Sequence, residues 1–316
     1  TTEIYTLSLH DALPICEISL GAWVTFGSQI DEKTASDLVH AAYDQGVNFF
    51  DIADVYAKGK AEEILGRAIA DIPRENLVLS SKVFFPTSDA VNARGLSRKH
   101  ITESLHASLK RMQVDYLDIY YCHRHDPDTT VQEVVQTMDM LVRRGEILYW
   151  GTSQWGVFHL MRAIAFAKQN GLIPPMVEQP KYNLFHRTYV ENELSQLCSE
   201  YGIGLTTFSP LHSGVLTGKY NDGIPEGSRA AMPDMGWMHS RITPEVIDKV
   251  KQLTDLAGEI GATTAQLSIA WLLRRKDVSS VITGATRLEQ LDENLAASEF
   301  CDALSDDILD KIDSIF

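Results

Sequence analysis

The chain has 316 residues, of which 44% are hydrophobic and 22% are charged, a composition typical of a globular protein with one large barrel domain or two ordinary domains. Its formal net charge of −15 disfavours nucleic acids and anionic membrane surfaces as partners, because both require a dominant basic face. No apolar run approaches the roughly 18 residues needed to cross a bilayer, so we expect no membrane insertion.

The N-terminal segment and the cysteines indicate the cellular compartment. The segment lacks the basic-then-apolar order of a signal peptide, and the four cysteines form no C-x-x-C pair. Reduced thiols in a cytoplasmic protein are therefore favoured over zinc or disulfides. Within residues 1–16, LSLHDALPI resembles a translated sequencing-adapter remnant. We expect one domain at 17–316, preceded by an atypical segment at 1–16 whose native origin this resemblance puts in question.

From Glu17 onward, short apolar segments alternate with segments of helical periodicity. Eight such units in about 300 residues, without a linker, predict a single (β/α)8 TIM barrel with long loops at its C-terminal face. A doubly wound sheet is the alternative, but the G-x-G-x-x-G motif typical of its dinucleotide site is absent. The predicted strands lie at 18–23, 47–51, 77–83, 116–122, 147–151, 176–179, 203–208 and 278–282.

The predicted helices follow these strands, with caps at Asp31 and Ser97. A polar stretch at 212–242 interrupts the alternation, and its length without predicted structure indicates a lid or binding loop. The helices are expected near 31–46, 61–73, 97–112, 131–145, 157–164, 190–201, 244–260, 263–275, 287–297 and 305–314.

Polar residues stand at the predicted C-terminal ends of several strands, where barrel enzymes carry their active sites. The stretch GVNFFDIADVY ends one strand with Asp51 and places Tyr56 in the following loop. Lys82 and His123 end or follow two further strands. One acid, one phenol, one ammonium and one imidazole are thus expected to converge on one face of the barrel.

This constellation resembles the aldo-keto reductases, whose tetrad is Asp, Tyr, Lys and His. The resemblance runs from Leu20 to about Ala297 and is carried by FFDIADVY, SSKVF, YYCHRHDPD, WGTSQW, EQPKYNLF, TTFSPLHSGVLTGKY and VITGATRLEQLDENL. Three more segments are similar to the branch formed by the β subunits of voltage-gated potassium channels and their bacterial and plant reductase relatives: AWVTFGSQI, YAKGKAEEILG and RGLSRKHI.

The four residues suit reduction of a carbonyl by hydride, which requires a proton donor for the developing alkoxide. A tyrosine with its ordinary pKa near 10 matches neutral pH poorly, and an ammonium at Lys82 would stabilise its phenolate by roughly 1.4 kcal/mol per unit of lowered pKa. Asp51 is expected to keep Lys82 charged. His123 is expected to direct the carbonyl oxygen or to contribute to proton transfer. We therefore predict Tyr56 as the general acid.

Each of these residues also has a structural interpretation, as packing, a cap or a buried ion pair. The combination of all four at strand ends favours catalysis. A metal is the alternative for the imidazoles and carboxylates after the fourth strand, but a solvated loop is favoured and no metal is predicted. These residues are His123, His125, Asp126 and Asp128.

The resemblance implies a nicotinamide dinucleotide bound in extended form without a Rossmann fold. It implies that Phe208 stacks on the nicotinamide and that Ser153 and Gln179 hold its carboxamide. The other positions that match the family's cofactor site are Trp23, Gln29, Gln154, Ser209, Pro210, Leu211, Ser213, Gly214, Lys219, Arg229, Gly284, Thr286, Arg287, Gln290, Glu293 and Asn294.

The adenosine end of this site suggests which dinucleotide binds. Thr286 follows Gly284 at the start of a predicted helix, where backbone N–H groups and the helix dipole favour an anion. Arg229 and Arg287 favour a 2′-phosphate, and hence NADPH over NADH. The alternative for Arg287 is an exposed helix residue. For the small carbonyl substrate, we expect an aromatic pocket formed by Trp23, Tyr56 and Trp155.

Two classes of function follow. The first is an NADPH-dependent reductase of aldehydes or ketones. The second is a cofactor-loaded regulatory or interaction protein similar to the channel β subunits, although mammalian channel subunits carry asparagine where this chain has His123. The resemblance also implies a homo-oligomer, a tetramer. A barrel lyase that uses Lys82 as a Schiff base is a weaker third alternative.

Overall fold

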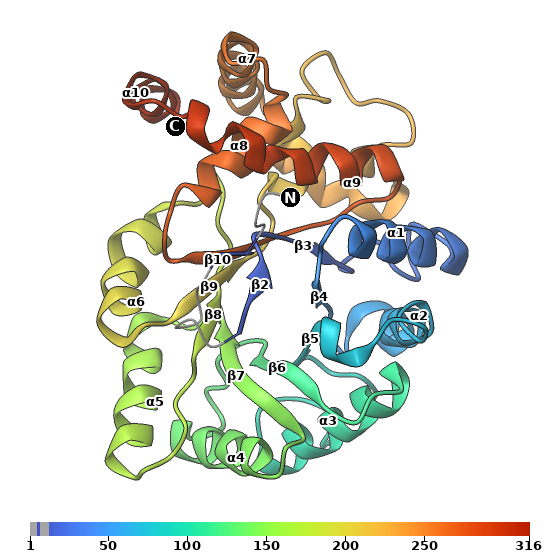
Figure 1. Cartoon of the computed structure of the whole chain (residues 1–316), viewed down its shortest axis with the longest axis vertical. Coiled ribbons are helices and arrows are strands. Elements are labelled where there is room, and N and C mark those ends of the chain that lie inside the picture. The colour runs from blue at the N-terminus through green and yellow to red at the C-terminus, as the bar shows by residue number, and fades with distance from the viewer. Residues whose placement is uncertain (1–4, 7–12) are drawn as a thin grey trace.

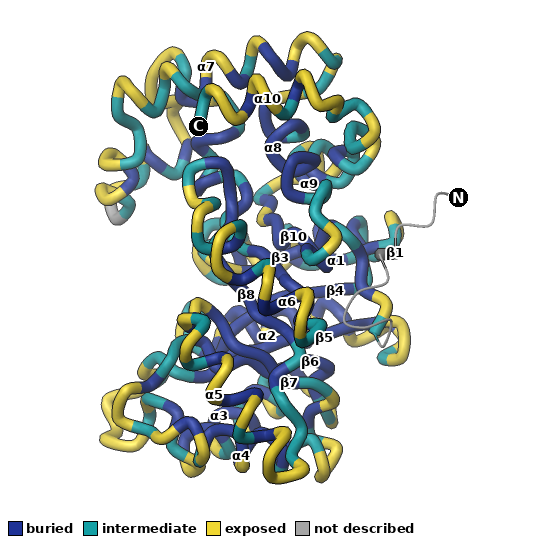
Figure 2. Tube along the Cα trace, turned by 90° about the vertical axis from the view of Figure 1, so that its left-hand side faces the viewer, coloured by how far each residue is buried: buried dark blue, intermediate teal, exposed yellow. Residues whose placement is uncertain are grey.

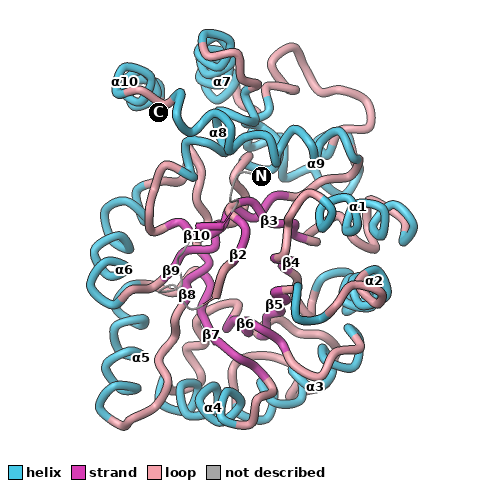
Figure 3. Tube along the Cα trace, viewed as in Figure 1, coloured by secondary structure: helices cyan, strands magenta, loops and turns pink. Residues whose placement is uncertain are grey.

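The computed structural model describes residues 5–6 and 13–316. Eight parallel strands form a closed barrel in the order β10–β3–β4–β5–β6–β7–β8–β9, and helices surround it (Figures 1 and 3). The predicted TIM barrel is therefore confirmed. The barrel strands are β3 (Ile18–Gly21), β4 (Phe49–Asp51), β5 (Val78–Val83), β6 (Leu117–Cys122), β7 (Ile147–Ser153), β8 (Val177–Gln179), β9 (Gly204–Thr207) and β10 (Val278–Thr283).

The helices begin where the sequence supplies caps. Asp31 accepts a hydrogen bond from the Thr34 N–H, and Ser97 accepts one from the His100 N–H, as their positions predicted. None of the helices in the described part of the chain combines the length and apolarity needed to cross a bilayer. The helices are α1 (Glu32–Asp44), α2 (Lys60–Ala68), α3 (Arg98–Met112), α4 (Val131–Arg143), α5 (Val157–Gln169), α6 (Ser195–Tyr201), α7 (Pro244–Glu259), α8 (Thr264–Leu273), α9 (Leu288–Leu295) and α10 (Asp306–Ile315).

Two segments differ from the prediction. The helix expected at 190–201 is π-helical over Tyr189–Leu194 before α6 continues it. The stretch 212–242 was expected to lack structure, but it holds 3-10 helices at His212–Thr217, Arg229–Ala231 and Pro233–Arg241. Such short helices were missed because they have no apolar periodicity long enough to detect in the sequence.

Residues before β3 close the N-terminal end of the barrel. The strand β2 (Ile15–Cys16) pairs with β1 (Tyr5–Thr6), and both residues of β2 are fully buried. The Cys16 N–H donates to the side-chain oxygen of Asn48 over 2.9 Å, and the Asn48 amide donates to the Pro14 carbonyl over 3.0 Å. Within the atypical segment 1–16, residues 1–4 and 7–12 lie outside the described part of the chain.

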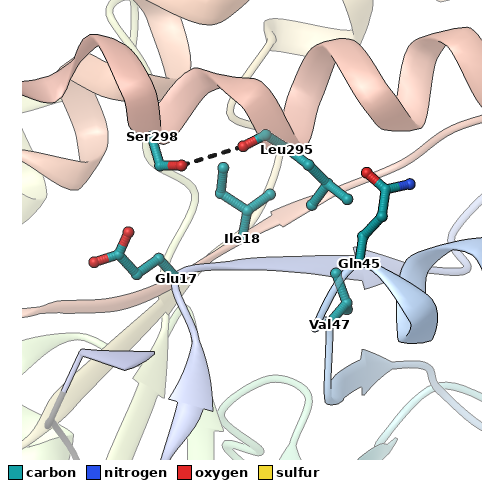
Figure 4. Close-up of a pocket in the computed structure, with 6 residues that line it drawn as sticks. All are labelled: Glu17, Ile18, Gln45, Val47, Leu295 and Ser298. Atoms are coloured by element: carbon teal, nitrogen blue, oxygen red, sulfur yellow. Dashed lines mark hydrogen bonds between the residues drawn. The ribbon is translucent and has the colours of Figure 1, made fainter. Parts of the chain in front are cut away.

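Figure 2 shows that burial concentrates on the strands and on the inner faces of the helices. A pocket of about 40 Å³ opens at the same N-terminal end of the barrel (Figure 4). Glu17 and Ile18 line it from the start of β3, and Ser298 lines it from the segment after α9. Residues at this end of a TIM barrel contribute mainly to stability, so this pocket is not a candidate for chemistry.

Helices α2 and α3 approach each other closely at Gly66. A Cβ at this position would lie 2.5 Å from the main-chain oxygen of Met112, and a backbone atom cannot rotate away as a side chain can. The contact therefore requires glycine.

We predict that Gly66→Ala lowers the free energy of unfolding by about 1–3 kcal/mol, because the added methyl group must push α3 away. Urea denaturation measures the change. Gly258→Ala in α7 is the matched control, because the added methyl group would meet no atom within 4 Å. The higher helix propensity of alanine should raise the free energy of unfolding by up to about 1 kcal/mol. Equal effects of the two substitutions would contradict this account.

A buried polar network supports the loop after β4 from the outside of the barrel. Ser104 of α3 donates to a carboxylate oxygen of Asp54 over 2.6 Å. Ser81 of β5 and Arg111 of α3 each donate to the carboxylate of Glu62 over 2.6 Å. Burial raises the pKa of Asp54 from 3.8 to about 7, against the smaller lowering effect of the Ser104 hydrogen bond.

Because the folded protein binds this proton more tightly than the unfolded chain, Asp54 stabilises the fold below pH 3.8 and loses this contribution as the pH rises through about 7. We predict that Asp54→Asn flattens the fall in unfolding free energy between about pH 4 and 8. Denaturation at a series of pH values tests this. A slope identical to that of the wild type would show that Asp54 does not titrate in this range.

Candidate active site

A buried ion pair lies at the C-terminal end of β4 and β5. Lys82 is fully buried, and its ammonium donates to the Asp51 carboxylate over 2.6 Å and to the Ile52 carbonyl over 2.6 Å. Asp51, which is 4% exposed, also accepts hydrogen bonds from Ser80 over 2.7 Å and from Gln179 over 3.0 Å. These bonds fix the orientation of both charged groups.

Tyr56 lies beside this pair. Its hydroxyl is 3.4 Å from the Lys82 ammonium, which thereby has three acceptors for its three N–H groups. A turn with left-handed conformations at Ala57 and Lys58 follows Tyr56 and leads into α2. The described structure thus brings the phenol, the ammonium and the carboxylate into one contact network.

The pKa of Tyr56 is shifted upward, whereas Lys82 alone would shift it downward. Burial raises the pKa of Tyr56 above 10, and this effect outweighs the lowering effect of the Lys82 charge. Burial lowers the pKa of Lys82, but Asp51 and Tyr56 more than offset this, and the net shift is upward. At neutral pH the phenol therefore carries its proton and the lysine carries its charge.

His123 follows β6 directly and faces the same group. Its ring centroid lies 6.1 Å from that of Tyr56 and 5.0 Å from that of Phe85. Burial, together with the charges of Lys82 and Arg124, holds the pKa of His123 well below 6.5, so the imidazole is neutral. Its Nδ1 is buried and has no hydrogen-bond partner among the described residues.

The ends of β7, β8 and β9 place the residues expected to hold a nicotinamide. The Ser153 hydroxyl donates to the main-chain oxygen of Gln179 over 2.9 Å, and Gln179 in turn contacts Asp51. Phe208, just beyond β9, donates its N–H to the Pro180 carbonyl over 3.1 Å. These three residues and the tetrad therefore share one end of the barrel.

Strained backbone conformations gather at this end. Among the described non-glycine residues with positive φ, Gln113 ends α3, and the other seven lie in loops that follow β3, β4, β7 or β9. Such conformations cost roughly 1–3 kcal/mol each, are held by the surrounding structure and cluster at functional sites. The seven residues are Val24, Ala57, Lys58, Gln154, Ser209, His212 and Ser213.

Two residues that sequence reasoning missed support this end of the barrel. Glu178 of β8 is fully buried, accepts hydrogen bonds from the Thr152 hydroxyl and the Trp155 N–H, and has a pKa that burial raises to about 8. Arg124 bonds the His123 carbonyl and lies 3.4 Å from the Ser153 hydroxyl. Glu178 directly precedes Gln179 and Arg124 directly follows His123, and this adjacency was the available signal.

A second group of predicted residues carries positive charge. The Lys219 ammonium lies against Gly214, where a Cβ would be only 2.8 Å from it. Burial and the charges of Arg229 and Arg287 lower the pKa of Lys219. No described carboxylate lies within 4 Å of the Lys219 or Arg229 cationic nitrogens. The group therefore offers uncompensated charge to an anion.

The adenosine-end residues lie around the start of α9. Both the N–H and the hydroxyl of Thr286 donate to the side-chain oxygen of Gln290, over 2.9 and 3.0 Å. Arg287 is exposed and lies 3.6 Å from Glu289. Gly284 is exposed, Glu293 is half-buried and Asn294 is buried. Gln29 is half-buried and donates to the Met232 sulfur over 3.2 Å, so it lies close to the loop that carries Arg229.

The two tryptophans of the predicted aromatic pocket differ in exposure, and the pocket itself stays a prediction. Trp23 is 43% exposed, whereas Trp155 is 1% exposed and packs edge-on against His125 at 5.1 Å. Asp126, weighed above as a metal ligand, instead accepts hydrogen bonds from the Leu96 N–H and from the Thr129 hydroxyl. In the described part of the chain, no three potential ligand side chains converge as a metal site would require.

Comparison with known proteins identifies the family. The sequence profile of the aldo/keto reductase family matches residues 17–316. The chain is 47% identical to a protein of Arabidopsis thaliana named "Probable voltage-gated potassium channel subunit beta", over 96% of this chain and 93% of that protein. A protein of Oryza sativa subsp. japonica with the same name is 47% identical, over 97% and 94% of the two chains.

A relative from Schizosaccharomyces pombe is 43% identical, over 97% of this chain and 91% of that protein. These similarities extend over nearly the full lengths of the proteins, and the profile includes all eight strands of the barrel. The chain therefore belongs to the aldo/keto reductase family.

Proposed function

We propose that this chain reduces aldehydes or ketones to alcohols by hydride transfer from NADPH, with Tyr56 as the proton donor. Membership of the aldo/keto reductase family makes the chain an oxidoreductase of a family that uses NAD(P)H. The observation that carries the finer proposal is the contact of one buried ammonium, Lys82, with both Asp51 and the Tyr56 hydroxyl.

The residues present fit a nicotinamide dinucleotide. Lys219 and Arg229 supply positive charge without a described carboxylate partner, which suits phosphate groups. Gly214 permits the close approach of the Lys219 ammonium. When bound, NADPH would supply the hydride for the carbonyl carbon.

The proton chemistry belongs to Tyr56 and its neighbours. As negative charge develops on the carbonyl oxygen, the Tyr56 hydroxyl donates its proton to that oxygen, and the phenolate that remains faces the Lys82 ammonium. Asp51 holds Lys82 in place and charged. The neutral His123 ring lies beside Tyr56 and would help to orient the carbonyl oxygen. Solvent then returns a proton to Tyr56.

A second candidate function is that of a regulatory subunit that binds a membrane channel. It is supported by the names of the two plant relatives and by similarity over 93–94% of their lengths. Under this alternative the chain would form an oligomer, a tetramer by resemblance. Copurification with a membrane channel, together with no turnover of any aldehyde or ketone, would favour this function over the first.

We predict that Tyr56→Phe lowers kcat for NADPH-dependent aldehyde reduction by about 10²–10⁴-fold, because the general acid is lost while the ring is kept. NADPH oxidation, followed by absorbance with a panel of small aldehydes, measures the rate. Tyr43→Phe is the matched control, since it removes a hydroxyl that accepts a hydrogen bond from Asn76, away from the tetrad. Equal turnover by Tyr56→Phe and the wild type would rule out this mechanism.

We predict that Arg287→Ala and Thr286→Ala reduce the preference for NADPH over NADH about tenfold, since a charge-assisted bond to the 2′-phosphate is worth roughly 1.5–3 kcal/mol. Fluorescence titration with each dinucleotide gives the ratio of dissociation constants. Arg144→Ala, an exposed arginine after α4, serves as the control. An unchanged ratio in both variants would remove these residues from the phosphate site.

A further inference from the structure

A second basic cluster lies beside the candidate active site. It consists of Lys181, His186 and His212, and it joins the segment after β8 to the loop after β9. Lys181 comes two residues after Gln179, whose amide contacts Asp51, so the cluster lies at the same end of the barrel as the tetrad. The main chain of Lys181 also forms a β-bridge with Phe208.

The hydrogen bonds define the protonation of this cluster. The Lys181 ammonium donates to His186 Nε2 over 2.8 Å, and His186 Nδ1 lies 3.3 Å from the Asn183 side-chain oxygen. A neutral imidazole that accepts at Nε2 and donates at Nδ1 satisfies both contacts. Asn183 in turn donates to the Ser209 carbonyl over 2.8 Å. Among the described residues the Lys181 ammonium has no second acceptor, so two of its N–H groups remain for a ligand.

His212 gives an independent indication of a ligand. Its side chain is 5% exposed, and its Nδ1 is buried without a hydrogen-bond partner among the described residues. Its ring centroid lies 5.0 Å from that of His186 and 5.1 Å from that of Phe185. An unsatisfied buried nitrogen costs roughly 1–3 kcal/mol, and a bound acceptor would remove this cost.

The positive charge of Lys181 has no carboxylate partner among the described residues. Burial and the charge of Arg241 lower the pKa of Lys181 to about 8. Burial, Lys181 and Arg241 also lower the pKa of His186 to about 4 and that of His212 to about 3. In the described part of the chain, no carboxylate lies within 4 Å of the Lys181 ammonium. An anion is the ligand that would stabilise such a group.

The cluster is distinct from the cations expected at the dinucleotide phosphates. The charges of Arg229 and Arg287 lower the pKa of Lys219, whereas the charge of Arg241 lowers the pKa values of Lys181, His186 and His212. The charge of Arg241 also lowers the pKa of Arg229, and its guanidinium donates to the Ser213 hydroxyl over 2.6 Å, so Arg241 adjoins both groups. The barrel mouth therefore carries two separate basic groups.

We propose that Lys181, His186 and His212 form a subsite for an anionic group, a carboxylate or a phosphate, carried by the carbonyl substrate. The assignment to a substrate rests on the proposed reductase function, whereas the binding of an anion does not. Lys181 supplies the charge and two N–H groups, and His212 supplies a buried ring nitrogen. The reductase would thereby prefer acidic aldehydes or ketones to neutral ones.

The test compares Lys181→Met with the wild type, both saturated with NADPH, on 4-carboxybenzaldehyde and on its neutral counterpart 4-methylbenzaldehyde. We expect the KM for the carboxylate to rise about tenfold and the KM for the neutral aldehyde to stay within about twofold, since one charge-assisted bond is lost. Lys251→Met, an exposed lysine of α7, is the matched control and should change neither value.

A second measurement needs no turnover. Calorimetric titration of the NADP⁺-saturated protein with inorganic phosphate should show binding that Lys181→Met weakens about tenfold and Lys251→Met leaves unchanged. If no aldehyde is reduced, the reductase proposal fails and this titration alone decides whether the anion site exists. The inference is overturned if phosphate binding and both KM values are unaffected. It is also overturned if Lys181→Met weakens NADPH binding instead, since the cluster would then serve the cofactor.

Discussion

The structure depends on placing one ammonium inside the barrel. Lys82 has no access to water, so each of its N–H groups needs an acceptor from the protein. Asp51 provides one from the neighbouring strand, and the loop after β4 folds back to provide the Ile52 carbonyl and the Tyr56 hydroxyl. Removing one partner of such a buried pair typically costs about 3–5 kcal/mol. The requirement to satisfy this charge therefore also positions the candidate proton donor.

The two ends of the barrel divide stability from chemistry. At the N-terminal end, buried apolar residues and the hydrogen bonds of Asn48 close the floor. At the other end lie the strained loops, two groups of basic side chains, and the neutral His123, whose Nδ1 has no partner among the described residues. A chain with a formal charge of −15 thus concentrates positive charge where its strands end. Local rather than net charge decides what such a site attracts.

Much of this arrangement could be predicted from the sequence. Apolar periodicity located the strands, and strand ends located Asp51, Lys82 and His123, because these features depend on near neighbours in the chain. The net pKa of Tyr56 could not be predicted, since burial is a property of the assembled barrel. The proximity of Lys181 and His212 could not be predicted for a similar reason. They are 31 positions apart and come together only when β8 and β9 pair.

The closure of the barrel has a consequence for how the protein is made. Leu20 of β3 pairs with Thr283 of β10, so one edge of the first barrel strand pairs with a strand near the other end of the chain. During synthesis, the edges of β3 and β9 that will pair with β10 remain free until β10 leaves the ribosome. The ion pair between β4 and β5, in contrast, is local and can form early. Until the ring closes, these two strand edges present unpaired N–H and C=O groups on which another chain could pair.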